Sequence, residues 1–205
     1  MKTLGRLLLP LLLTSTWLIQ SARAEGGYLG LEAGLAFADI NADATAQALA
    51  NASGQTVVYT YDSATFTGRL AAGFKFNEMF SAEIGYFATG DIGATYTGTT
   101  FSAVENFSAN GFDFALLIHP ASEGFFVKLG AHSSEVEGEI GVLTPLFNVT
   151  GTASVSGTGM LFGLGYDWSM GENDFLRASY TFYDEIGGLK NTEIGLLSVS
   201  YNIGF

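Results

Sequence analysis

Apolar and polar residues alternate along most of this chain. The clearest example is the C-terminal segment, residues 193–205, in which every second side chain from Leu197 to Phe205 is apolar. Small or polar side chains fall between them, with Leu196 as the exception. A period of two is typical of a β-strand with one apolar and one polar face.

The same period recurs in seven earlier segments. With the last one they predict eight strands, over residues 28–38, 65–77, 80–89, 111–119, 125–134, 156–168, 175–183 and 193–205. A tilted strand crosses a bilayer with about 9–11 residues, and each predicted strand is close to that length. We therefore predict an all-β fold, an eight-stranded antiparallel up-and-down transmembrane β-barrel.

The connections between the predicted strands alternate in length. Short turns follow the second, fourth and sixth strands, at 77–79, 120–124 and 169–174. Longer loops follow the first, third, fifth and seventh strands, at 39–64, 90–110, 135–155 and 184–191. Short turns on one rim and long loops on the other are typical of transmembrane barrels, and an even number of strands places both termini at the short-turn rim.

Aromatic residues gather near both ends of the predicted strands, as expected of side chains at the two membrane interfaces. Those near the short turns are Phe74, Phe76, Phe80, Phe125, Trp168, Phe175 and Phe205. Those near the long loops are Phe37, Phe66, Tyr86, Phe112, Tyr180 and Phe182.

The composition favours a membrane barrel over a soluble one. Charged residues make up 14% of the chain, against about 25% in an average soluble domain. A soluble up-and-down barrel turns its apolar face inward and its charged face to water. Here the polar face carries few charges and many of the 27 glycines, which suits a narrow interior.

Residues 1–24 have the pattern of a secretory signal peptide. Lys2 and Arg6 form the positive start, an apolar region follows, and residues 22–24 are an A-x-A cleavage site. A membrane anchor is the alternative, but Thr and Ser at 14–16 interrupt the apolar region, which is shorter than the ~20 residues that a span needs. We expect residues 25–205 to form one barrel domain.

The part of the chain after the signal is strongly acidic. It keeps five of the eight Lys and Arg and all twenty Asp and Glu. This balance excludes nucleic acid as a partner. The predicted loops are rich in carboxylates, and Lys190 is their only cation. Divalent cations that bridge to lipopolysaccharide are one interpretation, and a solvated acidic rim is the one that we favour.

Several short motifs occur in a characteristic order: YLGLEAG at 28–34, SAEIGY at 81–86, FVKLG at 126–130, FGLGY at 162–166, LRASY at 176–180 and YNIGF at 201–205. In these motifs the chain resembles the OmpA-type family of eight-stranded outer-membrane β-barrels. The larger members carry a peptidoglycan-binding domain after the last strand, so cell-wall tethering is not expected here.

The resemblance implies a monomer in the outer membrane of a Gram-negative cell, with both termini periplasmic and the long loops extracellular. Its expected partners are outer-membrane lipid, lipopolysaccharide and the barrel-assembly machinery. That machinery recognises the closing strand, for which Tyr201, Ile203 and Phe205 are the matching residues in this chain.

Eight charged residues on the predicted strands share the inward parity. The cations are Arg69, Lys75, Lys128 and Arg177, and the acids are Glu32, Glu83, Asp113 and Asp167. A cation facing lipid at mid-bilayer costs about 2–4 kcal/mol, so we expect these charges to pair inside the barrel. Lys128 is predicted to bridge Glu32 and Glu83, with Arg177 and Asp167 nearer the short turns.

Motifs for catalysis or cofactor binding are scarce. The sequence has no nucleotide-binding loop, no CxxC and no HExxH, and its histidines are His119 and His132. His132 and Ser134, followed by Glu135, Glu137 and Glu139, allow a Ser-His-Glu hydrolase of the lipid A deacylase kind. Both residues have the inward parity, whereas an enzyme that acts on membrane lipid needs them to face lipid.

We therefore predict a small non-enzymatic barrel, without cofactor or metal, whose lumen is plugged by charge and whose role is structural or surface-presenting. A narrow channel for small or hydrophobic solutes, similar to the OmpW group, is the alternative. A lipid A-modifying hydrolase is the less favoured third hypothesis.

Overall fold

A computed structural model describes residues 26–38, 41–120, 124–171 and 173–205 of the chain. The predicted signal segment lies outside these residues. Among the described residues, no helix has the length and apolar character needed to cross a membrane. The elements are β1 (Gly26–Ala38), α2 (Ala42–Ser53), β2 (Val58–Tyr61), β3 (Ala64–Lys75), β4 (Phe80–Thr89), β5 (Ile92–Thr97), β6 (Ser102–Ile118), β7 (Phe125–Leu143), β8 (Asn148–Ser169), β9 (Phe175–Tyr183), η1 (Ile186–Gly188) and β10 (Ile194–Gly204).

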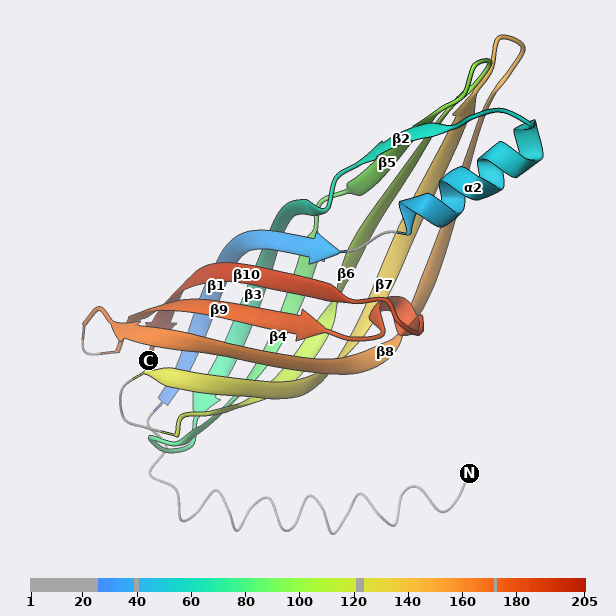
Figure 1. Ribbon diagram of the computed structural model, residues 1–205. Helices are drawn as coiled ribbons and strands as arrows, with labels where there is room; N and C mark the ends of the chain where they lie inside the picture. The colour runs from blue at the N-terminus through green and yellow to red at the C-terminus, as the bar shows by residue number, and fades with distance from the viewer. Residues whose placement is uncertain (1–25, 39–40, 121–123, 172) are drawn as a thin grey trace, which may run out of the picture.

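Eight of the strands form a closed antiparallel barrel (Figure 1). Around the barrel they run β1, β3, β4, β6, β7, β8, β9 and β10. The last strand closes the ring on the first, with a register from Tyr28 opposite Gly204 to Ala38 opposite Ile194. The predicted fold is therefore confirmed, and each of the eight predicted segments lies on one of these strands.

The two faces of the barrel have opposite character. On the outer face Leu31 is 66% and Phe66 80% exposed, whereas Glu83 and Lys128, on the inner face, are 2% and 3% exposed. A soluble protein would bury the first pair and expose the second. An apolar exterior around a polar interior is the arrangement of a barrel that lies in lipid.

One predicted belt residue faces the other way. Phe175 is 4% exposed and its ring packs inside the barrel, with its centroid 5.2 Å from that of Tyr28. Its assignment to the outer belt was wrong because Phe175 has the same parity as Arg177, two residues later on β9.

Much of the predicted long loops is regular structure. Three barrel strands continue beyond the ring as residues 102–109 of β6, 135–143 of β7 and 148–156 of β8, and β2 and β5 pair beside them. We call this five-stranded extension the ledge. Figure 1 shows it projecting from one end of the barrel. The predicted loops 39–64, 90–110 and 135–155 therefore require correction.

Helix α2 covers part of the ledge. Its N-cap is Asn41, whose side-chain oxygen accepts from the Ala44 amide at 3.2 Å, and its C-cap is Gly54, which has a φ of 68°. Its buried alanines, Ala42 and Ala46, pack against β5 and β6 in one apolar cluster. The alanine-rich sequence suits a helix, because its small side chains let the helix lie close to the sheet.

The two ends of the barrel differ as the loop lengths predict. At one end the turn after β3 is tight, because Asn77 Oδ1 accepts from the amides of Met79 and Phe80, both at 2.8 Å. The described N-terminal residue and Phe205 lie at this same short-turn end, where Gly27 and Phe205 exchange two backbone hydrogen bonds. The ledge and η1 lie at the opposite, long-loop end.

Candidate functional site: the barrel interior

A set of buried ion pairs occupies the middle of the barrel, and Arg69 on β3 is its centre. Its Nε and Nη2 donate to the two carboxylate oxygens of Asp113 at 2.8 and 2.6 Å. Its Nη1 donates to Glu32 and Glu83, both at 3.2 Å. The planar guanidinium supplies five N–H donors in a fixed fork, so one arginine holds three carboxylates from three strands.

Arg177 on β9 extends the set toward the short-turn end. Its Nε and Nη2 donate to Asp167 at 2.6 and 2.8 Å, and its Nη1 pairs with Glu83. Lys128 Nζ lies 3.7 Å from Glu83 Oε2. The Tyr28 hydroxyl donates to Glu83 at 2.7 Å. Glu83 therefore joins the two arginines and Lys128, and we call these seven ionic side chains the inner ion cluster: Glu32, Arg69, Glu83, Asp113, Lys128, Asp167 and Arg177.

The pairing differs from the predicted one in two respects. Lys128 contacts Glu83 but has no ion pair with Glu32, because Arg69 stands directly opposite Glu32 in the register of β1 and β3 and takes that place. Lys75, the eighth predicted residue, stands apart. Its Nζ lies 4.5 Å from the centroid of the Phe175 ring, and among the described residues it forms no ion pair.

Aromatic and hydroxyl side chains that the sequence analysis did not single out complete the interior. The Tyr183 hydroxyl donates to Asp113 at 3.0 Å, and the Ser198 hydroxyl donates to Glu32. The guanidinium carbon of Arg177 lies 4.4 Å from the centroid of Phe126. Their inward parity was visible in the sequence, but nothing in the pattern showed which of them reach the charges.

Glycines on the inner face make room for these long side chains. A Cβ at Gly85 would lie 2.5–2.6 Å from the Arg69 guanidinium, and one at Gly73 would lie 2.1–2.5 Å from the Tyr28 ring. Larger residues at either position would displace the side chains that bind Glu83. The long inward side chains and the glycines beside them therefore depend on one another for space, and the charges are not independent.

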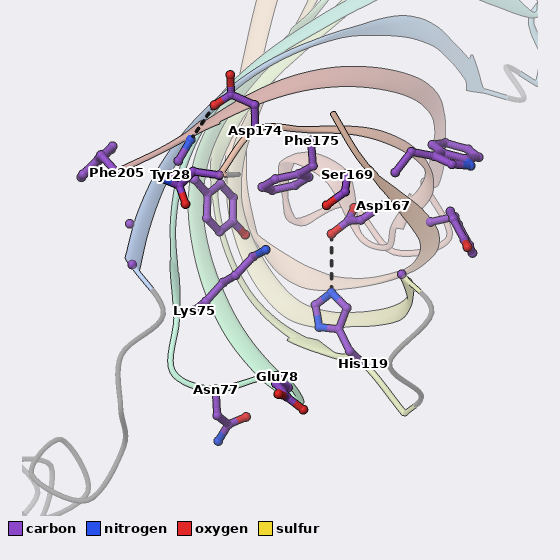
Figure 2. Close-up of a pocket in the computed structure, with 17 residues that line it drawn as sticks. Tyr28, Lys75, Asn77, Glu78, His119, Asp167, Ser169, Asp174, Phe175 and Phe205 are labelled. Carbon is purple, nitrogen blue, oxygen red and sulfur yellow. Dashed lines mark hydrogen bonds and ion pairs between the residues drawn. The ribbon is translucent and has the colours of Figure 1, made fainter. Parts of the chain in front are cut away.

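A polar vestibule of about 800 Å³ opens at the short-turn end (Figure 2). Figure 2 shows Tyr28, Lys75 and Phe175 on one side of it and His119 facing Asp167 on the other. His119 Nε2 lies 3.6 Å from Asp167 Oδ2. The vestibule thus ends at the inner ion cluster, since Asp167 belongs to both.

At the long-loop end the chain between β9 and β10 folds into the barrel. Ile186 is fully buried, in an apolar cluster with Phe87, Leu161 and Tyr183. We call residues 184–188, which include η1, the mouth turn. Its backbone takes positive φ at Glu185, Gly187 and Gly188, and glycine adopts this conformation at little cost.

His132 and Ser134 on β7 hold the mouth turn in place. His132 Nε2 lies 2.8 Å from the carbonyl oxygen of Asp184, so this ring nitrogen carries the proton and donates it. The Gly187 amide donates to Ser134 Oγ at 2.9 Å. Opposite them, a Cβ at Gly159 would lie 2.0 Å from the Asp184 carbonyl oxygen, so β8 admits the turn because this residue is glycine.

These contacts involve the same two residues, His132 and Ser134, on which the hydrolase hypothesis rests. His132 and Ser134 are each 3% exposed, and among the described residues no hydrogen bond joins them to each other or to Glu135, Glu137 or Glu139. Both side chains bind the mouth turn instead. The parts of the chain that the structure describes also contain no group of three or more His, Asp or Glu close enough to hold a metal ion.

Comparisons with known proteins identify the family of this chain. The family model described as the OmpA-like transmembrane domain matches residues 22–204, while no curated protein matches the chain. Similar solved structures include Ail of Yersinia pestis, with 14% identity, 87% of this chain and 99% of that chain covered, and a TM-score of 0.46.

Two other solved structures extend the comparison. Neisserial surface protein A has 19% identity over 89% of this chain and 99% of its own, with a TM-score of 0.42. OprG of Pseudomonas aeruginosa has 8% identity over 89% of this chain and 98% of its own, with a TM-score of 0.38. Because the family model spans nearly the whole chain and the structure is a closed barrel with an apolar exterior, the protein belongs to the OmpA-like transmembrane domain family of bacterial outer-membrane β-barrels.

Proposed function

We propose that this protein is a closed, non-enzymatic outer-membrane barrel that stabilises the envelope and presents the ledge and α2 at the cell surface. The observation that carries the proposal is the filled interior. The inner ion cluster crosses the middle of the barrel, and a second layer, formed by Phe87, Leu161, Tyr183 and Ile186, is fully buried behind it. An ion that enters the vestibule meets both layers.

A narrow channel, the alternative function, requires a continuous wet or apolar path through these layers. The side chains of Arg69, Glu83 and Asp113 are 0–3% exposed, and Arg69 binds both carboxylates directly. Separating them would strand buried charges, which is costly. The interior therefore favours a closed barrel over a channel.

Conductance measurements test this function. We expect the refolded full mature chain to give no steady unit conductance in planar bilayers, because the two layers leave no open path. A porin measured in the same bilayers controls for detection, and heat-modifiable migration of the protein from the same preparation controls for folding. A stable open level with reproducible size would overturn the closed-barrel proposal and favour the channel.

The proposed orientation places the short-turn end in the periplasm and the ledge outside the cell, as long connections are in such barrels. The chain has no cysteine, so single cysteines report sidedness directly. Leu146, at the tip of the hairpin between β7 and β8, is 91% exposed. Glu78 lies in the short turn between β3 and β4 and is also exposed.

We expect a membrane-impermeant maleimide to label Leu146→Cys on intact cells but to leave Glu78→Cys unlabelled until the outer membrane is permeabilised. Both positions are accessible, so accessibility alone does not explain the difference. The reverse labelling pattern would invert the proposed orientation and remove the ledge from the cell surface.

A further inference from the structure

A second cavity, of about 320 Å³, lies at the long-loop end. It is separate from the vestibule, and its walls come from the mouth turn, the first turn of α2, the base of the ledge and the start of β10. We call it the mouth pocket. Its lining includes Ala42, Ile92, Glu105, Val136, Ile186 and Glu193. Its volume is at the lower end of the ~300–1,000 Å³ of small-molecule sites.

The mouth pocket separates two apolar clusters that are each well packed. Ile186, Ile194 and Ala109 belong to the cluster inside the barrel, and Ala42 belongs to the cluster between α2 and the ledge. All four residues line the pocket and are at most 7% exposed. Among the residues that the structure describes, no side chain lies between these apolar walls, and an apolar group placed there would regain packing contacts.

The charged groups that line the pocket have one sign. Glu105 and Glu193 contribute carboxylates, and no Lys or Arg is among the lining residues in the described part of the chain. Glu105 accepts from the Tyr96 hydroxyl at 3.0 Å. Burial, with the Glu105 carboxylate adding to it, raises the pKa of Tyr96 above its ordinary value, so Tyr96 stays a neutral donor.

Two nearby features favour an anion, but both are weak. Lys190 follows Leu189 at the edge of the pocket, yet its side chain is exposed and is not part of the lining. The N-terminus of α2 also faces this region. There Asn41 already accepts from the Ala44 amide, and Asp43 in the first turn offsets the helix dipole.

We propose that the mouth pocket binds a small amphiphilic amine from outside the cell. The apolar body would lie against Ile92, Val136 and Ile186, and the ammonium group would pair with Glu105 and Glu193. The pocket is a blind site, because Ile186 closes its floor above the filled interior. This inference rests on the proposed orientation of the barrel, but not on the barrel being closed, since the pocket lies on the outer side of the mouth turn.

Three water-soluble probes with the same aromatic body test the proposal. They are 2-phenylethylamine, 2-phenylethanol and 3-phenylpropionate, added to the full mature chain in lipid nanodiscs with labelled isoleucine methyl groups. We expect saturable NMR shifts at Ile92, Ile186 and Ile194 with the amine. The alcohol should bind about tenfold more weakly, a difference of about 1.4 kcal/mol, because it cannot form the partly exposed ion pairs with the two carboxylates. The carboxylate should bind more weakly still.

The outer-face methyl groups of Ile84 and Ile203, 56% and 54% exposed, report partition of the probes into lipid. Shifts confined to these two residues would overturn the proposal, as would a carboxylate that binds as tightly as the amine.

Paired charge variants separate specific recognition from bulk charge. The double variant Glu105→Gln and Glu193→Gln should lower the affinity for the amine about tenfold, to that for the alcohol. The control variant, Asp62→Asn with Glu139→Gln, removes two exposed carboxylates of the same end that do not line the pocket, and should leave the affinity unchanged. Equal loss in both variants, or no loss in the first, would overturn the proposal. The probe series on the unaltered chain decides the question even if a variant misfolds.

Discussion

Replacing Arg69 with methionine should lower the free energy of unfolding by about 3–5 kcal/mol, the cost of removing one partner from a buried ion pair. The substitution removes five hydrogen bonds to carboxylates and leaves Glu32, Glu83 and Asp113 without their shared cation. Asp113 suffers most, because it loses two hydrogen bonds and keeps only the Tyr183 hydroxyl as a donor among the described side chains. Methionine fills much of the same space, so the loss reports charge rather than a cavity.

Urea titrations of the refolded protein in micelles, followed by the heat-modifiable shift on gels, measure this free energy. Lys128→Met is the matched control, since it also removes a buried cation. Lys128 contacts one carboxylate, at 3.7 Å, and that carboxylate, Glu83, keeps both arginines. We expect a clearly smaller loss. Equal losses would show that the two cations are equivalent and that Arg69 is not the centre of the cluster.

Much of the barrel follows from the period of two in the sequence. Parity separates the lipid-facing side chains from the inward ones on all eight barrel strands, because a strand turns each successive side chain to the other face. The parity of a residue shows which face of the sheet it lies on, but not its depth along the barrel axis. Arg177 and Asp167 were placed together nearer the short turns, and they are direct cross-strand neighbours. The pair of Glu32 with Arg69 is also a direct cross-strand pair, but it can be identified only when the stagger between β1 and β3 is known. This is why Lys128 was assigned to Glu32.

The ledge escaped prediction because its sequence lacks the apolar alternation of the barrel strands. Residues 148–156 of β8 are all exposed and consist mostly of Thr, Ser, Gly, Ala and Val. With water on both sides, no apolar alternation is required, so the segment looks like a polar loop. Helix α2 did leave a signal in the sequence. Asn41 and Gly54 flank an alanine-rich stretch, and that combination of caps predicts a helix.

The mouth turn illustrates a different limit of prediction from the sequence. Ile186 is one apolar residue in a short connection, and its burial depends on His132 and Ser134, some fifty residues earlier in the chain. The two residues did attract attention in the sequence, as candidate catalytic groups. Local pattern showed that they point inward, but their partners are backbone groups of another segment, which side-chain chemistry alone does not identify.

Deleting Phe205 should leave little folded protein in the outer membrane while the purified chain still folds. In the structure Phe205 is 75% exposed and extends the pairing of β10 with β1 through two hydrogen bonds with Gly27, at 2.9 and 3.1 Å. Eleven further residue pairs join these strands. Loss of two terminal hydrogen bonds, each worth about 0.5–1.5 kcal/mol, should weaken the closure without preventing it.

The larger effect is expected during assembly, if the machinery that inserts these barrels binds the aromatic side chain that the structure leaves exposed at the end of β10. Heat-modifiable protein in outer-membrane fractions measures assembly, and refolding of the same variant into micelles measures intrinsic folding. Phe205→Tyr, which keeps the aromatic ring and both backbone hydrogen bonds, is the control and should assemble normally. If the deletion lowers both quantities equally, the residue acts through barrel closure alone, and normal outer-membrane levels would exclude a role for Phe205 in recognition.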